Sequence, residues 1–268
     1  KCFSSEKANS ATLETNGIDN VERWLNMSIP DVYSSELSEF VFASGLKLLE
    51  EWFPDVMYLS TTDYIQHKYA PEDKEAIKFL TMIDNYLSEI SKFDVTMVIT
   101  ADHGMSAKHN KNGDPQIVFI QDFLDEEFGT NSTNVILPIT DPYVVHHGAL
   151  GSYATIYFNE KRIYNEAFSK LKSLKGIDQI CSKDEAVKRF DLPSDRIGDI
   201  VITSSEKITL GKTKSYHDLK SLKEPLRSHG GLSEQKVPFI VNKPINLSSV
   251  KDLKNYDAFF YACEASFN

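Results

Sequence analysis

The chain has 268 residues, of which 41% are hydrophobic, and it carries a formal net charge of -10 at pH 7. This length allows one domain, or a core domain with an insertion. The acidic charge, with no block of basic residues, argues against nucleic acid as a partner. No apolar run reaches the roughly 20 residues of a membrane span, so we expect no membrane partner either.

The three cysteines, Cys2, Cys181 and Cys263, are scattered along the chain and odd in number. This usage is typical of a reducing compartment rather than of a disulfide scaffold, and we therefore expect a cytoplasmic protein. It also indicates that any metal ion would be bound by carboxylates and imidazoles rather than by thiolates.

The first part of the chain predicts a strand, a helix and a second strand, preceded by another helix. Residues 32–53 and 73–90 carry apolar side chains at helical spacing. Residues 56–59 and 95–100 are short apolar runs typical of buried parallel strands. A strand, helix and strand in this order form a right-handed βαβ unit, so we expect the two strands to be parallel.

The pattern changes between about Ser106 and Leu226, where short alternating strands and helices predict an α+β insertion. The strands are expected at residues 117–120, 153–158 and 200–203, and the helices at residues 166–174 and 183–189. Residues 237–241 then return to the main sheet. We predict an α/β fold with a mostly parallel sheet flanked by helices, formed by residues 1–105 and 227–268, and a cap-like insertion formed by residues 106–226.

Three short motifs carry side chains that bind metal ions: residues 60–67, 100–105 and 227–231. Asp63 and His67 are four residues apart, so they share one face if a helical turn begins after the first strand. Carboxylate and imidazole are suitable zinc ligands. An Asp at a strand end is also a common helix N-cap, and this alternative stays open.

Asp102 and His103 follow the second strand directly, and Gly104 permits a tight turn there. Sites in α/β sheets gather at the carboxyl ends of strands, so both pairs are expected at one edge. With His229 from the third motif there are five candidate ligands, which is too many for one tetrahedral zinc and indicates two cations. A His-Gly sequence is also common in ordinary loops.

The three motifs together resemble the metal motifs of the alkaline phosphatase superfamily, and residues 59–71 and 141–152 resemble phosphonoacetate hydrolases in particular. The resemblance implies two zinc ions and a homodimer. It implies one zinc bound by Asp63, His67 and His229. It implies another bound by Asp102, His103, a further Asp and a nucleophilic Thr.

No motif of this chain matches the further Asp and the Thr, and the chain begins at Lys1 without an initiator Met. We therefore expect both residues upstream, an N-terminally incomplete chain, and no catalysis by the chain alone.

The implied activity is the zinc-dependent hydrolysis of the carbon–phosphorus bond of phosphonoacetate, a small phosphonate, to acetate and phosphate. Basic groups would recognise the substrate carboxylate, and Lys108, His109, His146 and His147 are the candidates, although each could equally be structural. Two alternatives remain: a nucleotide pyrophosphatase or phosphodiesterase of the same superfamily, and a non-catalytic metal-binding fragment.

Overall fold

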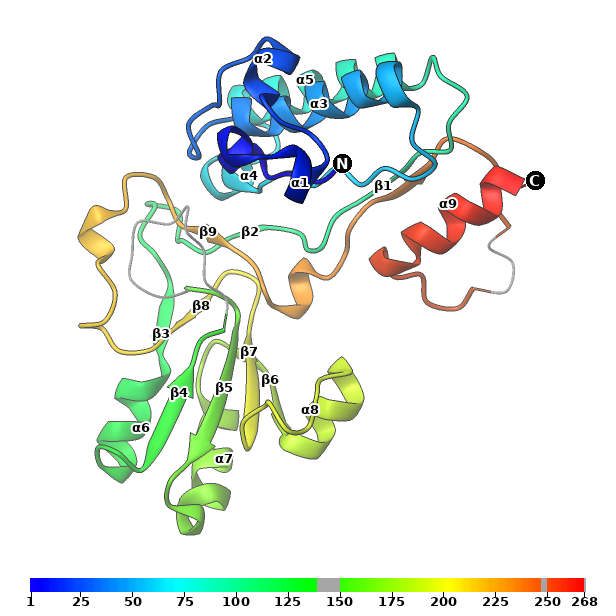
Figure 1. Ribbon diagram of the computed structural model, residues 1–268. Helices are drawn as coiled ribbons and strands as arrows, with labels where there is room; N and C mark the ends of the chain where they lie inside the picture. The colour runs from blue at the N-terminus through cyan, green and yellow to red at the C-terminus, as the bar shows by residue number, and fades with distance from the viewer. Residues whose placement is uncertain (139–149, 247–249, 268) are drawn as a thin grey trace. The chain divides into compact units, whose positions relative to one another are not determined.

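The computed structural model describes residues 1–138, 150–246 and 250–267. Of Phe267 it describes the backbone alone. The chain forms two compact units (Figure 1): unit 1 comprises Lys1–Ile99 and Phe239–Asn268, and unit 2 comprises Thr100–Pro238. Helices accompany parallel and antiparallel strand pairs, so the predicted α/β class is confirmed. Most of the segment 141–152, including His146 and His147, lies outside the described residues.

Unit 1 is built around two long helices, α3 (Glu36–Trp52) and α5 (Lys74–Ile90), which lie side by side. Both were predicted from their apolar spacing. Helix α3 ends where Phe53 adopts a left-handed conformation, with φ of 44°, just before Pro54. The other described α-helices and strands of the unit are α1 (Leu13–Asn16), α2 (Val21–Leu25), α4 (Tyr64–Lys68), α9 (Ala258–Phe267), and the paired strands β1 (Val98–Thr100) and β10 (Phe239–Val241).

The prediction of a strand at residues 56–59 is wrong. These residues are irregular, and Val56 and Tyr58 are 68% and 72% exposed. A strand requires a neighbour that bonds its backbone, and in the described part of the chain this run joins no sheet. The predicted parallel pairing with β1 is therefore not formed, although α5 and β1 themselves are confirmed.

Unit 2 contains a four-stranded antiparallel sheet in the order β4-β5-β7-β6. Its strands are β4 (Thr133–Ile136), β5 (Tyr153–Phe158), β6 (Ile177–Ser182) and β7 (Ile200–Ser204). The unit also contains two short strand pairs: β3 (Ile117–Phe119) is parallel to β8 (Thr209–Gly211), and β2 (Ser106–Ala107) is antiparallel to β9 (Arg227–Ser228).

The two faces of the four-stranded sheet pack against different helices because side chains alternate along each strand. Ile156 and Ile202 belong to a buried cluster with residues of α6 (Ile120–Phe128) and α7 (Tyr164–Ser173). Val201 belongs to a second cluster with residues of α8 (Lys183–Phe190). A one-residue slip of β7 would exchange these faces, so the register is strongly fixed.

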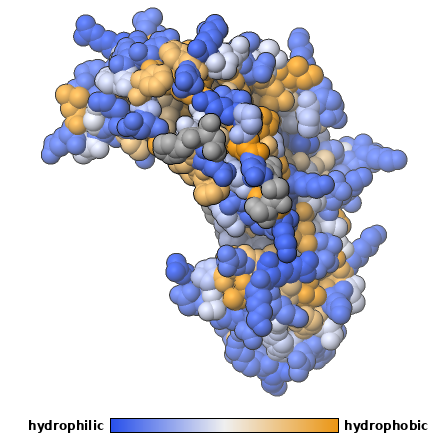
Figure 2. Space-filling model, turned by 90° about the vertical axis from the view of Figure 1, so that its right-hand side faces the viewer, coloured by the Kyte–Doolittle hydropathy of each residue, from blue (hydrophilic) through white to orange (hydrophobic). Residues whose placement is uncertain are grey.

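Several elements of unit 2 were predicted within two residues, namely β3, β5, β7, α7 and α8, whereas α6, β2, β4, β6, β8 and β9 were missed. The predicted boundaries of the insertion stay a prediction. Among the described helices, none is long and apolar enough to cross a membrane. Hydrophilic residues cover most of the face shown in Figure 2, with hydrophobic residues interspersed.

Candidate metal centre

In unit 1, Asp63 and His67 form a close pair at the short helix α4. Asp63 precedes the first residue of α4, and the backbone N–H of His67 donates to the Asp63 carbonyl oxygen at 3.1 Å. This first helical turn brings Asp63 Oδ2 to 3.2 Å from His67 Nε2. The His67 side chain is 3% exposed and that of Asp63 31% exposed. The predicted spacing of four residues on one helix face is therefore confirmed.

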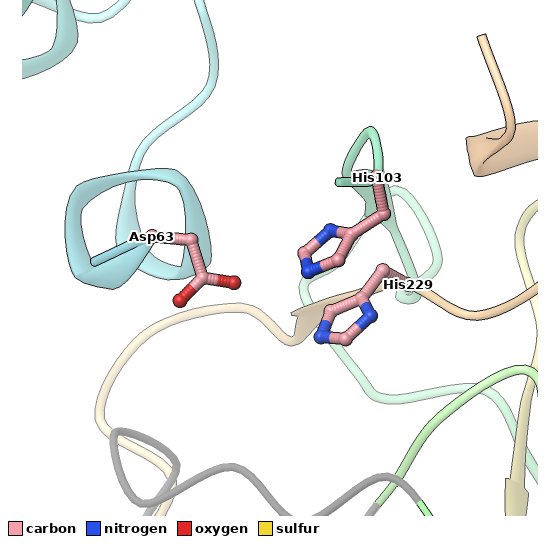
Figure 3. A group of neighbouring side chains, drawn as sticks. All are labelled: Asp63, His103 and His229. Atoms are coloured by element: carbon pink, nitrogen blue, oxygen red, sulfur yellow. The ribbon is translucent and has the colours of Figure 1, made fainter. Parts of the chain in front are cut away.

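In unit 2, the imidazole rings of His103 and His229 are stacked, with centroids 3.6 Å apart and planes 4° from parallel (Figure 3). His103 lies three residues beyond Thr100, the last residue of β1, and His229 follows β9 directly. The motif at residues 227–231 thus lies beside the motif at residues 100–105, as the sequence predicts.

Asp102 lies on the solvent side of His103 and contacts it. Its side chain is 85% exposed, its Oδ1 accepts the backbone N–H of His103 at 3.1 Å, and its Oδ2 lies 3.6 Å from His103 Nε2. His103 Nδ1 is 3.0 Å from the Gly104 carbonyl oxygen, so Nδ1 carries the proton in this arrangement. Nε2 is then the ring nitrogen that lies beside the Asp102 carboxylate.

These distances fit a zinc ion. Two ligands at about 2.1 Å from a tetrahedral zinc are about 3.4 Å apart. The Asp63–His67 separation of 3.2 Å and the Asp102–His103 separation of 3.6 Å lie on either side of this value. Asp63, His103 and His229 are half-buried side chains that each offer a ligand atom (Figure 3).

The backbone around His229 is held from both sides. The pairing of β2 with β9 places Ser106 opposite Ser228, and the N–H of Ser152 donates to the His229 carbonyl oxygen at 2.8 Å. Gly230 then turns the chain with φ of 98°, a conformation that favours glycine. The position of His229 is therefore determined by backbone contacts.

A cavity of about 240 Å³ opens beside Asp102 and His103 within unit 2. Its walls combine the glycine turn after His229 with side chains of the sheet, of the end of α8 and of the segment that follows it, including Tyr153, Phe190 and Leu192. The His103 side chain is 24% exposed. A small ligand can thus approach this side of the histidine pair.

Of the residues proposed to recognise a substrate carboxylate, Lys108 is placed in the interior. Its side chain is 0% exposed, and its Nζ donates to Glu234 Oε1 at 3.1 Å and to the Glu206 carbonyl oxygen at 2.6 Å. Burial lowers the pKa of Lys108, and the charge of Glu234 opposes this shift. Lys108 is therefore structural. His109 is half-buried, with its Nδ1 2.8 Å from the Asn110 carbonyl oxygen.

Glu234 was missed from the sequence, because nothing in its local pattern distinguishes it from a surface acid. Its side chain is 1% exposed. Burial acts to raise its pKa, but hydrogen bonds from Ser106 and Ser233 and the charge of Lys108 outweigh burial, so the pKa lies below its ordinary value. Glu234 is therefore a charged carboxylate in the interior of unit 2.

The fold and these motifs define the class of protein. The chain belongs to the type I phosphodiesterase / nucleotide pyrophosphatase family, whose model matches residues 4–232 and which is part of the alkaline phosphatase superfamily. The chain is 55% identical to phosphonoacetate hydrolase from Sinorhizobium meliloti 1021, in crystal structures with phosphonoacetate and with phosphonoformate. Each match covers 99% of this chain and 64% of that enzyme, with a TM-score of 0.94. The expected resemblance is thereby confirmed.

A more distant match shows the fold alone. Human ectonucleotide pyrophosphatase / phosphodiesterase 5 is 15% identical, with a TM-score of 0.55, and the match covers 90% of this chain and 61% of that protein. The chain thus spans less than two thirds of the length of each of these relatives.

Proposed function

We propose that this chain is the metal-binding part of a zinc-dependent hydrolase that cleaves the carbon–phosphorus bond of phosphonoacetate, giving acetate and phosphate. The observation that carries the proposal is the pair of Asp–His contacts at 3.2 and 3.6 Å, in a chain 55% identical to a phosphonoacetate hydrolase. The crystal structures of that relative with phosphonoacetate and phosphonoformate support a small phosphonate as the substrate.

The resemblance assigns Asp63, His67 and His229 to one zinc and Asp102 and His103 to the other. Bound zinc would neutralise phosphonate oxygens and lower the pKa of a coordinated hydroxyl. The residues of this chain orient the ligand atoms: the Gly104 carbonyl oxygen selects the His103 tautomer, and the first turn of α4 holds His67 against Asp63. Such preset ligands reduce the cost of ordering a metal site.

The nucleophilic Thr and the further Asp that the resemblance implies match no motif of this sequence. With Asp102 and His103 as two of four ligands, one zinc should bind weakly, because each missing ligand removes charge compensation. We therefore expect the 268-residue chain alone to bind zinc without hydrolysing phosphonoacetate.

A chimera tests this proposal. The chain would be joined to the part of the Sinorhizobium meliloti enzyme that it does not cover, and phosphate release from phosphonoacetate would be measured with and without zinc. We expect zinc-dependent release by the chimera and none by the chain alone, with the Asp102→Asn chimera as the matched inactive control. A folded, zinc-loaded chimera that releases no phosphate would refute the proposed activity.

The second candidate is a phosphodiesterase or nucleotide pyrophosphatase, and the name of the matching family model favours it. Comparing phosphonoacetate with a nitrophenyl phosphodiester in the same chimera separates the two candidates. A non-catalytic metal-binding chain would bind zinc and leave both substrates intact in the chimera. The homodimer that the resemblance implies is tested by the mass of the chimera in solution.

A further inference from the structure

Glu234 touches both loops that carry the stacked histidines. Its carbonyl oxygen accepts the N–H of Gly104, the residue after His103, at 2.6 Å. Its carboxylate Oε2 accepts the N–H of Gly231, two residues after His229, at 2.8 Å. One buried residue therefore bonds the backbone beside each imidazole.

Both glycines lie close to Glu234. A Cβ atom added at Gly231 would lie 2.9 Å from Glu234 Oε2 and 2.9 Å from the Cβ of Ser152. A Cβ atom added at Gly104 would lie 3.3 Å from the carbonyl oxygens of Glu234 and Lys236. The two loops thus fit around Glu234 with little room for displacement.

The carboxylate is itself held in place. Its Oε1 accepts hydrogen bonds from Lys108 Nζ at 3.1 Å and from Ser233 Oγ at 2.6 Å, Oε2 accepts the Gly231 N–H, and the Ser106 side chain also donates to the carboxylate. Lys108 is anchored in turn by the Glu206 carbonyl oxygen. Because both charges are buried, removing either partner alone would strand the other in a poorly solvated site.

We propose that Glu234 is the positioning residue of the histidine pair: its backbone carbonyl oxygen ties the His103 loop to the His229 loop through the Gly104 N–H, its carboxylate closes the His229 loop through the Gly231 N–H, and Lys108 holds that carboxylate in place. The proposal rests on the metal-binding role given above. The proposal gives a structural role to the buried ion pair of Lys108 and Glu234, whose side chains are 0% and 1% exposed and do not reach a substrate.

Two double variants test this role without stranding a buried charge. Lys108→Met/Glu234→Gln keeps an oxygen that can accept the Gly231 N–H, whereas Lys108→Met/Glu234→Leu removes it. Zinc affinity would be measured by competition with a chromophoric chelator, and folding by thermal melting. We expect zinc binding about tenfold weaker in the Leu variant than in the Gln variant, at similar melting temperatures. Equal zinc affinities in two folded variants would overturn the proposal.

Amide hydrogen exchange of the unmodified chain gives a second measurement if the Leu variant does not fold. We expect the amides of Gly104 and Gly231 to exchange slowly without zinc, since Glu234 accepts both. Exchange of these two amides as fast as that of the exposed Lys111 would overturn the proposal. Failure of the unmodified chain to bind zinc would count against the metal-binding role alone, and the exchange measurement would still decide on Glu234.

Discussion

The rings of His103 and His229 lie face to face, 3.6 Å apart, although 126 residues separate them in the sequence. Two imidazoles in this position can each donate a lone pair to a cation on the same side of the pair. Removing one of the two rings therefore tests the metal centre directly, and His109 provides a control position.

Replacing His229 with Ala should remove one bound zinc per chain in a titration followed by calorimetry, because the ring supplies a nitrogen ligand. His109→Ala is the control, since His109 Nδ1 is 2.8 Å from a backbone oxygen and belongs to neither motif pair. Equal zinc stoichiometry in both variants would exclude His229 as a ligand.

Replacing Asp63 with Asn should weaken zinc binding at least about tenfold, because the substitution removes an anionic ligand 3.2 Å from His67 Nε2. Asp84→Asn, an exposed position of α5 in the same unit, makes the same chemical change and should leave the affinity unaltered. A helix-capping role alone would change the melting temperature of Asp63→Asn but not its zinc affinity.

Tyr153 should make the free energy of unfolding fall as the pH rises above 10. Burial, with smaller contributions from Tyr157 and Cys181, raises the pKa of its phenol to about 12. From pH 10 to 12 the unfolded chain ionises this phenol while the folded chain does not, so its contribution is present below pH 10 and lost as the pH rises to 12. Urea unfolding of the wild type should show a steeper loss of stability over this range than Tyr153→Phe, and parallel curves would contradict the raised pKa.

Leu171 of α7 is 0% exposed in the cluster that joins α6 and α7 to the sheet. Leu171→Ala should lower the free energy of unfolding of unit 2 by about 2–5 kcal/mol, because it removes buried methyl groups and leaves a cavity. Ile136→Ala, at a position 40% exposed on β4, should cost less than about 1 kcal/mol. A loss for Leu171→Ala no larger than for Ile136→Ala, in urea unfolding, would contradict this core assignment.

Local patterns predicted the local parts of the candidate site. The spacing of Asp63 and His67 predicted their contact because one helical turn determines it, and the helical spacing in residues 73–90 predicted α5. The run at residues 56–59 has the composition of a strand but lacks a bonding neighbour, which composition cannot reveal. The role of Glu234 depends on Lys108, 126 residues away, and no local pattern encodes such a pairing.

The short pairing of β2 with β9 has an evolutionary consequence. It places Ser106 opposite Ser228, so the two ends of the chain segment between the histidine loops are paired with each other. Insertions or deletions in that segment, away from Lys108 and Ser152, which contact the His229 loop, would leave the histidine loops in register. Most of the intervening segment can thus change in length during evolution while the spacing of the two histidine loops is kept.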